Sequence, residues 1–329
     1  MRILVYKDNL STGRGADRAV RNFAAGMEER GHDVALSEKK ELGARLQETW
    51  DVIVATGSNE AVDLDGLGYF ERRDRAKVVL QLHLVPRGFF KWKHPIRNWR
   101  IRRAFQKADA VQVLCRSYEA EFLKIAPHAK VATIGNYTEI EGGQAAARPG
   151  PVILYPAAAF TRVKNQSLLI RAFALLAHDF PEWRLRLPGR VDTRCGERCR
   201  KLAGQLGVAG RIDFIGFTKD LTDEYSNAAF MAFPSTLEGF PLALLEGAKF
   251  GLCAVVHSAL PGVADIVSDG ETGIVTAPAA EAYAEGLRRL MSDAELRRTM
   301  GVKSRRFCAE HYSRARILDR WESLLSACR

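Results

Sequence analysis

The stretch FPSTLEGFPLALLEGAKFG, residues 233–251, decides the fold of this chain. It continues an apolar run of strand length at 230–234, turns through EGFP at 238–241, and becomes a predicted helix. Gly239 suits a tight turn, and Pro241 suits the first helical position, where a missing N–H breaks no helical bond. The N-terminal end of such a helix favours a phosphate group. The stretch therefore predicts a strand, an anion-binding loop and a helix in succession.

Two carboxylates in this stretch are spaced for binding a ligand. Glu238 lies in the turn, and Glu246 lies about two helical turns further along. Leu244 and Leu245 would face the core while Glu246 faces the ligand, so the two carboxylates would accept hydrogen bonds from hydroxyls at two points of a sugar nucleotide. From the spacing alone, a capped surface helix with two solvated glutamates is the alternative.

Short apolar runs alternate with helical patterns on both sides of this stretch. The runs before it are at residues 3–6, 51–57, 77–83, 109–114, 130–134, 152–156, 183–189 and 211–216, a further strand is expected to begin at Val34, and one more run follows at 253–257. Continuous apolar strands that alternate with helices predict parallel sheets covered on both faces. The fold class is therefore α/β, with two Rossmann-like domains and a ligand cleft between the carboxyl ends of their sheets.

The stretch EGGQAAARPGP, residues 141–151, has the composition of a linker. It divides a predicted N-terminal domain, residues 1–146, from a predicted C-terminal domain, residues 147–312. A last amphipathic helix is expected over residues 313–329.

Composition and charge narrow the classes of function. The chain has 329 residues, of which 47% are hydrophobic and 27% charged, which excludes disordered and fibrous proteins. Its formal net charge of +10 calls for an anionic partner or surface. The six cysteines are too sparse for a disulfide scaffold, and the pair Cys195 and Cys199 lacks a second pair at zinc spacing. With no apolar run of signal-peptide or membrane-spanning length, we expect a cytoplasmic protein, soluble or bound to a membrane face.

Much of the positive charge lies in PRGFFKWKHPIRNWRIRRAFQK, residues 86–107, where eight lysines or arginines alternate with aromatic side chains. This composition suits a membrane–water interface, nucleic acid, or a solvated helix whose aromatic residues pack inward. The candidate residues for contact with a membrane or an acceptor are Lys91, Trp92, Lys93, Arg97, Trp99 and Arg100.

The pattern P-S-x-x-E-G-F-P-L-x-L-L-E resembles the signature of the large family of retaining GT-B glycosyltransferases with the Glu-x7-Glu motif (family 4-like, group 1). The resemblance extends to residues 15–34, 133–139, 211–217 and 265–278. It implies the GT-B fold, with the last helix packed back on the N-terminal domain. It also implies a nucleotide-sugar donor, retention of anomeric configuration, and no cofactor or divalent metal.

The resemblance assigns roles to individual residues. Glu246 would hold the ribose hydroxyls, Glu238 would lie close to the donor sugar, and Lys164 would neutralise the departing diphosphate. His83, at a strand end, would lie near the donor sugar and acceptor, and is assigned to catalysis with Glu238 and Lys164. The remaining donor-binding assignments are Gly15, Arg162, Gly216, Gly239, Phe240, Pro241 and Leu242, several of them through backbone amides.

Three positions depart from the family pattern. Ala159 stands where the family usually has an arginine five residues before the lysine, and Arg162 is a candidate replacement for that charge. Arg14 stands where a glycine is common, and LPGRVD, residues 187–192, lacks the acidic residue often found after its glycine. These departures concern how the diphosphate is bound.

We therefore expect a retaining hexosyltransferase that moves a hexose or N-acetylhexosamine from a nucleotide sugar, with UDP-sugars favoured. The acceptor would be a glycan or a lipid-linked glycan in bacterial surface-polysaccharide or lipopolysaccharide assembly. The expected location is the inner face of the cytoplasmic membrane, and nucleic acid is not an expected partner. The alternatives are a non-catalytic sugar-nucleotide or nucleic-acid binding protein and a nucleotide-sugar epimerase of the same fold.

Overall fold

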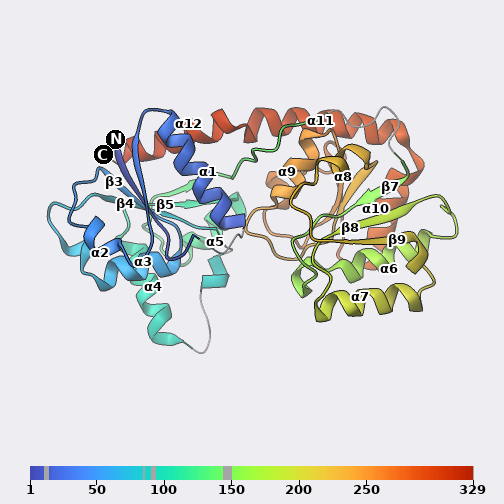
Figure 1. Cartoon of the computed structure of the whole chain (residues 1–329), viewed down its shortest axis with the longest axis horizontal. Helices are drawn as coiled ribbons and strands as arrows, with labels where there is room; N and C mark the ends of the chain where they lie inside the picture. The colour runs from blue at the N-terminus through green and yellow to red at the C-terminus, as the bar shows by residue number, and fades with distance from the viewer. Residues whose placement is uncertain (11–14, 84–85, 90–93, 144–149, 329) are drawn as a thin grey trace. The chain divides into compact units, whose positions relative to one another are not determined.

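The computed structural model describes residues 1–10, 15–83, 86–89, 94–143 and 150–328 (Figure 1). It divides into two compact units. The N-terminal unit comprises Met1–Glu139 together with Arg314–Arg329, and the C-terminal unit comprises Ile140–Ser313. Each unit is a parallel six-stranded sheet with helices.

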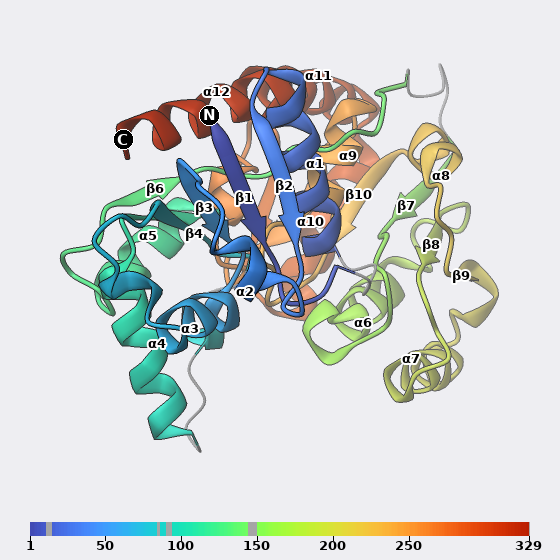
Figure 2. The ribbon, with the colours of Figure 1, turned by 60° about the vertical axis from the view of Figure 1, so that its left-hand side comes forward.

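The sheet of the N-terminal unit has the strand order β2-β1-β3-β4-β5-β6. Figure 2 shows β2, β1 and β3 side by side. Its strands are β1 (Arg2–Tyr6), β2 (Asp33–Ser37), β3 (Val52–Ala55), β4 (Lys77–Gln81), β5 (Ala110–Val113) and β6 (Val131–Thr133). The central strands β3, β4 and β5 are almost wholly buried, as expected when helices cover both faces. The strand order reverses direction at β1 and β3, so loops at their carboxyl ends diverge and leave room for a ligand.

The helices of this unit include one from the far end of the chain. They are α1 (Gly15–Glu29), α2 (Leu42–Arg45), α3 (Ser58–Gly66), α4 (Pro95–Lys107), α5 (Arg116–Leu123) and α12 (Arg314–Ala327), with short 3-10 turns at η1 (Tyr69–Glu71) and η2 (Pro86–Phe89). Figure 1 shows α12 alongside α1, where the rings of Phe23 and Trp321 lie 4.6 Å apart. Arg30, just after α1, also pairs with Glu322 of α12 at 2.5 Å. The predicted return of the last helix to the N-terminal domain is confirmed.

The sheet of the C-terminal unit has the order β12-β11-β10-β7-β8-β9. Its strands are β7 (Val152–Leu154), β8 (Arg184–Pro188), β9 (Ile212–Gly216), β10 (Phe230–Phe233), β11 (Ala254–His257) and β12 (Gly273–Thr276). Its helices are α6 (Gln166–Leu176), α7 (Arg194–Gln205), α8 (Thr222–Asn227), α9 (Leu242–Lys249), α10 (Ala280–Ser292) and α11 (Ala294–Tyr312), with 3-10 turns at η3 (Arg162–Lys164), η4 (Ala209–Arg211) and η5 (Val263–Asp265).

The predicted domain boundary between residues 146 and 147 lies outside the described residues. The two compact units divide between Glu139 and Ile140. The chain returns to the N-terminal unit at Arg314, one residue after the predicted start of the last helix.

Candidate functional site

The predicted catalytic pair Lys164 and Glu238 comes together at the carboxyl edge of the C-terminal sheet. Strands β7 and β10 are neighbours and run parallel, so the loops that follow them lie side by side. The Nζ of Lys164 donates a hydrogen bond to Oε1 of Glu238 at 2.6 Å, and both side chains are largely buried. The amide of Thr236 donates to the carbonyl of Val163 at 2.8 Å and joins the two loops. This edge therefore holds a lysine and a carboxylate in a fixed arrangement.

A buried tyrosine, which the sequence analysis did not single out, holds these loops in place. The hydroxyl of Tyr155, just after β7, donates to the carbonyl of Lys164 at 2.8 Å. The same hydroxyl lies 2.7 Å from Oγ of Ser235, just after β10. Burial raises the pKa of Tyr155 well above its usual value, so the hydroxyl keeps its proton. The sequence feature that could have identified Tyr155 is its position at the end of an apolar strand, in LYP.

Glu246 is a buried carboxylate rather than a solvated one. Only 7% of the residue is exposed, and its Oε2 accepts a hydrogen bond from the hydroxyl of Tyr225 at 2.8 Å. Tyr225, in α8, stacks on Phe250 with ring centroids 5.4 Å apart, so the donor is itself fixed. The alternative of two solvated glutamates is wrong, because Glu238 is paired and Glu246 is buried and hydrogen-bonded.

The turn before α9 is packed and partly bonded to itself. Phe240 is 8% exposed, with its ring 5.5 Å from that of Tyr312. The helix begins at Leu242, so Pro241 lies one residue before it. The amide of Leu242 donates to the carbonyl of Phe240 at 2.9 Å. The Leu242 amide, assigned to the sugar and diphosphate, is therefore already used within this turn, which also contains Gly239.

Gly216 lies at the same sheet edge, at the end of β9. Its carbonyl accepts a hydrogen bond from the amide of Gly189 at 2.7 Å. Gly216 and Gly189 have φ values of +88° and +144°, which favour glycine. A Cβ at position 189 would lie 2.2 Å from the carbonyl oxygen of Ala157. Close backbone approach thus ties the loops after β7, β8 and β9 together.

The predicted replacement cation, Arg162, begins η3 and has an exposed side chain. Ala159 precedes it in the same loop and is half-buried. The structure therefore places Arg162 on the loop that carries Lys164, but brings no described carboxylate against its guanidinium.

The predicted residue His83 lies just after β4 in the N-terminal unit and is half-buried. Its Nε2 is buried and has no hydrogen-bond partner among the residues that the structure describes. Burial, followed by the nearby charge of Lys7, lowers the pKa of His83 to about 4. The imidazole is therefore neutral near pH 7, with a ring nitrogen unbonded.

Lys7, just after β1, is the centre of a charged cluster that the sequence analysis missed. Its Nζ lies 3.7 Å from Glu60, 3.9 Å from Asp17 and 3.9 Å from Asp8. The side chains of Asp17 and Glu60 are each 5% exposed, and burial raises the pKa of Glu60. Asp17 lies in the first turn of α1, two residues after Gly15, which begins that helix. The sequence feature that could have identified this cluster is the charged pair Lys7-Asp8 directly after an apolar strand.

The basic stretch is only partly described, because Lys91, Trp92 and Lys93 lie outside the described residues. In α4, Ile101, Ala104 and Phe105 are buried. Ile96 and Trp99 are 76% and 59% exposed, and the guanidinium of Arg103 lies 5.5 Å from the Trp99 ring centroid. Inward packing of the aromatic residues is therefore correct for Phe105 and wrong for Trp99.

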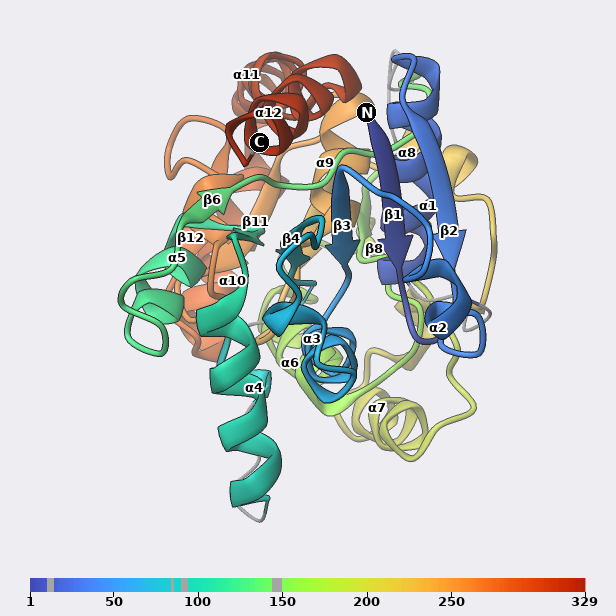
Figure 3. The ribbon, with the colours of Figure 1, turned by 90° about the vertical axis from the view of Figure 1, so that its left-hand side faces the viewer.

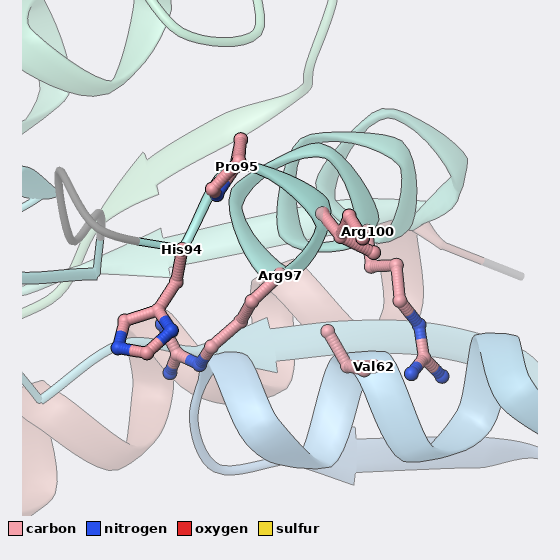
Figure 4. Close-up of a pocket in the computed structure, with 6 residues that line it drawn as sticks. Val62, His94, Pro95, Arg97 and Arg100 are labelled. Atoms are coloured by element: carbon pink, nitrogen blue, oxygen red, sulfur yellow. The ribbon is translucent and has the colours of Figure 1, made fainter.

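An open pocket of about 390 Å³ lies between α3 and α4 (Figure 4). Its lining consists of Val62, His94, Pro95, Ile96, Arg97 and Arg100. Arg97 donates to Oδ1 of Asn59 in α3 at 3.0 Å. Figure 4 shows His94 and Arg97 side by side and Arg100 extending towards α3. The N-terminal end of α4 projects away from the sheet of its own unit (Figure 3).

The aspartates and the cysteine that stand at spacings found in metal sites have other partners or surroundings. The one Asp-x-Asp triplet, Asp63-Leu64-Asp65, lies in α3. Asp63 accepts hydrogen bonds from Tyr6 and Lys39, whereas Asp65 pairs with Arg103 and Lys107. Cys199 is buried, and burial raises its pKa to about 11. Within the described ranges, no group of three or more His, Cys, Asp or Glu residues is arranged to hold a metal ion.

No helix in the described part of the chain is long and apolar enough to cross a membrane.

Solved structures resemble the whole chain. The complex of Alr3699/HepE from Anabaena with UDP matches with a TM-score of 0.83 and 17% identity, covering 99% of this chain and 100% of that one. Sucrose-phosphate synthase from Thermosynechococcus elongatus matches with a TM-score of 0.81 and 18% identity, covering 99% and 98%. These likenesses confirm the predicted GT-B fold.

Curated relatives match part of the chain. An exopolysaccharide phosphotransferase, SCO2592 of Streptomyces coelicolor, is 36% identical over 48% of this chain and 17% of its own length. The lipopolysaccharide core biosynthesis mannosyltransferase LpcC of Rhizobium leguminosarum is 30% identical over 51% of this chain and 48% of its own length. The chain thus matches less than half the length of either relative. The family model described as glycosyl transferases group 1 matches residues 138–307, more than half of the sequence, and the chain belongs to that family.

Proposed function

We propose that this protein is a retaining glycosyltransferase that uses a UDP-sugar. The observation that carries the proposal is the Lys164–Glu238 pair at the sheet edge, together with the buried Glu246 in the helix that follows Glu238, in a chain of this family. The sugar would be a hexose or N-acetylhexosamine, transferred to a glycan or a lipid-linked glycan. The likeness to a UDP-bound structure and to a lipopolysaccharide mannosyltransferase supports a role in bacterial surface-polysaccharide or lipopolysaccharide assembly.

Each of the three residues has a distinct part in the proposed reaction. Glu246 accepts hydrogen bonds from the ribose, and Glu238 contacts the donor sugar. Lys164 exchanges part of its interaction with Glu238 for the diphosphate and stabilises the negative charge that grows on the β-phosphate. Because a lysine supplies this charge, the proposed reaction uses no divalent metal and no other cofactor.

The proposed transfer takes place on one face of the sugar. The bond between the anomeric carbon and the β-phosphate oxygen breaks, and the acceptor oxygen bonds to the same face of that carbon. The acceptor hydroxyl gives its proton to the departing phosphate, so no protein nucleophile is required. Neutral His83, whose Nε2 is unbonded among the described residues, would accept a hydrogen bond from a neighbouring hydroxyl of the acceptor and orient it.

The proposed location is the cytoplasmic face of the membrane. On α4, the exposed side chains of Ile96 and Trp99 lie among arginines, which suits the interface of an anionic membrane. A lipid-linked acceptor would be reached from that surface.

The test is to incubate the protein with UDP-sugars or GDP-sugars and a membrane extract, and to measure both transfer and release of nucleoside diphosphate. We expect transfer from a UDP-sugar with retained anomeric configuration. Absence of transfer, of donor hydrolysis and of any thermal shift with nucleotides rejects the proposal. A nucleotide-induced shift without transfer would favour a non-catalytic sugar-nucleotide binding protein. This is the second candidate function, because Ala159 stands in place of the usual arginine. Saturable, sequence-independent DNA binding would favour a nucleic-acid binding protein.

A further inference from the structure

Two departures from the family pattern lie opposite each other in the C-terminal unit. A parallel β-bridge pairs Ala159, where an arginine is usual, with Arg190, where an acidic residue is often found. The amide of Arg190 donates to the carbonyl of Ala158 at 3.1 Å, and the amide of Phe160 donates to the carbonyl of Arg190 at 2.9 Å. The loop after β7 and the loop after β8 thus pair as short extensions of their strands.

This pairing places the side chains at 159 and 190 on one face. In a β-ladder, directly paired residues lie on the same side, and successive residues alternate. Phe160 is 1% exposed, with its ring 5.8 Å from that of Phe214, so its side chain faces the core. Ala159 therefore faces the other way, and the Arg190 side chain lies beside its single methyl group.

Arg190 differs in its partners from the arginines within the strand that leads to it. Arg184 pairs with Asp213 at 2.6 Å, and Arg186 pairs with Glu224 at 2.7 Å. Arg190 is exposed, and in the part of the chain that the structure covers its guanidinium has no carboxylate within ion-pairing distance. Arg190 therefore places a positive charge at the carboxyl edge of β8 that no described carboxylate neutralises.

A diphosphate bound at this edge of the C-terminal sheet would need a positive charge in addition to that of Lys164. A nucleoside diphosphate carries at least two negative charges, whereas the charge of Lys164 is offset by Glu238 at 2.6 Å. An arginine binds phosphate oxygens through two parallel N–H donors, which a lysine cannot do. We infer that Arg190 binds the diphosphate of the donor, from the strand opposite the position where the family carries its arginine. The inference rests on the proposed function, because that function supplies the diphosphate.

The experiment compares Arg190→Ala, Arg162→Ala and wild type by calorimetric titration with UDP and with uridine. We expect Arg190→Ala to weaken UDP binding about tenfold or more, the usual effect of losing a charge-assisted pair, and to leave uridine affinity within about twofold. Arg190→Lys should retain part of the affinity. Ala159→Arg added to Arg190→Ala should restore UDP binding, because the guanidinium then extends from the paired residue. Arg305→Ala, an exposed arginine of α11, is the matched control.

Several outcomes would overturn the inference. It fails if Arg190→Ala binds UDP as tightly as Arg305→Ala does, or if only Arg162→Ala loses UDP affinity. It also fails if UDP and uridine affinities fall together, since that pattern indicates a structural role. Wild-type protein that binds neither UDP nor GDP would instead reject the proposed function itself, whatever the variants do.

Discussion

At the scale of single residues, the short Lys164–Glu238 contact leads us to expect that loss of Lys164 affects the rate of transfer more than donor affinity. Lys164→Ala removes a cation but also frees Glu238 from its partner at 2.6 Å, so donor affinity should change less than the rate of transfer. Because the charge on the leaving phosphate grows in the transition state, we expect kcat to fall roughly 100-fold or more. Steady-state kinetics with a UDP-sugar measure the split. Unchanged kcat would contradict the role of Lys164.

Glu246 should act on binding instead. The carboxylate of Glu246 is buried. Glu246→Ala removes the carboxylate proposed to accept hydrogen bonds from the ribose hydroxyls, so nucleotide affinity should fall about tenfold or more. Calorimetric titration with UDP measures this loss. If Glu246→Ala binds UDP like wild type, the proposed ribose contact is wrong.

The hydroxyl of Tyr225 should matter because it fixes Glu246. Tyr225→Phe removes the 2.8 Å hydrogen bond to Oε2 and should weaken UDP binding about threefold to tenfold while costing roughly 1 kcal/mol of stability. Tyr283→Phe is the control, since Tyr283 is equally buried but donates to the carbonyl of Val255 at 2.8 Å. Both variants should lose stability, and only the first should lose UDP affinity. Equal effects of the two on affinity would contradict a positioning role for Tyr225.

His83 predicts a specific loss of stability in acid. Its pKa is about 4 in the folded protein, against 6.5 for an unperturbed histidine, so the unfolded chain binds more protons between these values. Stability from neutral His83 is therefore complete above pH 6.5 and falls as the pH drops to 4, by no more than about 3 kcal/mol. Denaturant unfolding of wild type and His83→Gln at pH 7 and pH 4.5 measures the difference. His257, whose pKa burial also lowers, contributes equally to both proteins. Equal acid sensitivity of the two proteins would show that His83 is not the responsible group.

At the scale of secondary-structure elements, α12 completes the core of the N-terminal unit. A Cβ added at Gly26 of α1 would lie 2.7 Å from Leu318 of α12, so the two helices approach closely at that point. Trp321 is 3% exposed, and Trp321→Ala should destabilise this unit by about 3–5 kcal/mol. Denaturant unfolding measures the loss, and UDP affinity in the folded variant should stay within about twofold, because Lys164, Glu238 and Glu246 lie in the other unit. Trp99→Ala, at an exposed tryptophan, is the control.

The sequence predicted the elements better than it predicted the neighbours of a side chain. Apolar runs marked nearly all the strands because both faces of each sheet are covered, and they missed β12, which begins at a glycine. The motif pointed to Glu238 and Glu246, and the wider family resemblance pointed to Lys164. It did not show that Tyr155 and Tyr225 hold them, because those contacts depend on strand order. Lys7 and Glu60 are likewise 53 residues apart and meet only because β1 and β3 are neighbours. The pairing of Ala159 with Arg190 has the same origin.

At the scale of the whole molecule, the charge excess is concentrated in one stretch. Residues 86–107 contain eight lysines or arginines and no acidic residue, so they account for most of the net charge of +10. The structure refines this picture, since Arg103 and Lys107 form ion pairs with Asp65 and Glu71. The cations nearer the N-terminal end of α4 lie beside exposed Ile96 and Trp99. That end of the helix is therefore the surface expected to meet a membrane.

Binding to vesicles tests whether charge and apolar insertion act together at this surface. Wild type should bind vesicles rich in phosphatidylglycerol, should bind phosphatidylcholine vesicles weakly, and should lose affinity as salt rises from 50 to 500 mM, because screening weakens each cation's attraction. Trp99→Ala combined with Ile96→Ser should weaken binding about fivefold or more at every salt concentration, since it removes apolar area and no charge. Leu175→Ser, at a 54% exposed leucine of α6, is the matched control. If the double variant binds like this control while salt still abolishes binding, the attraction is electrostatic alone and α4 does not insert.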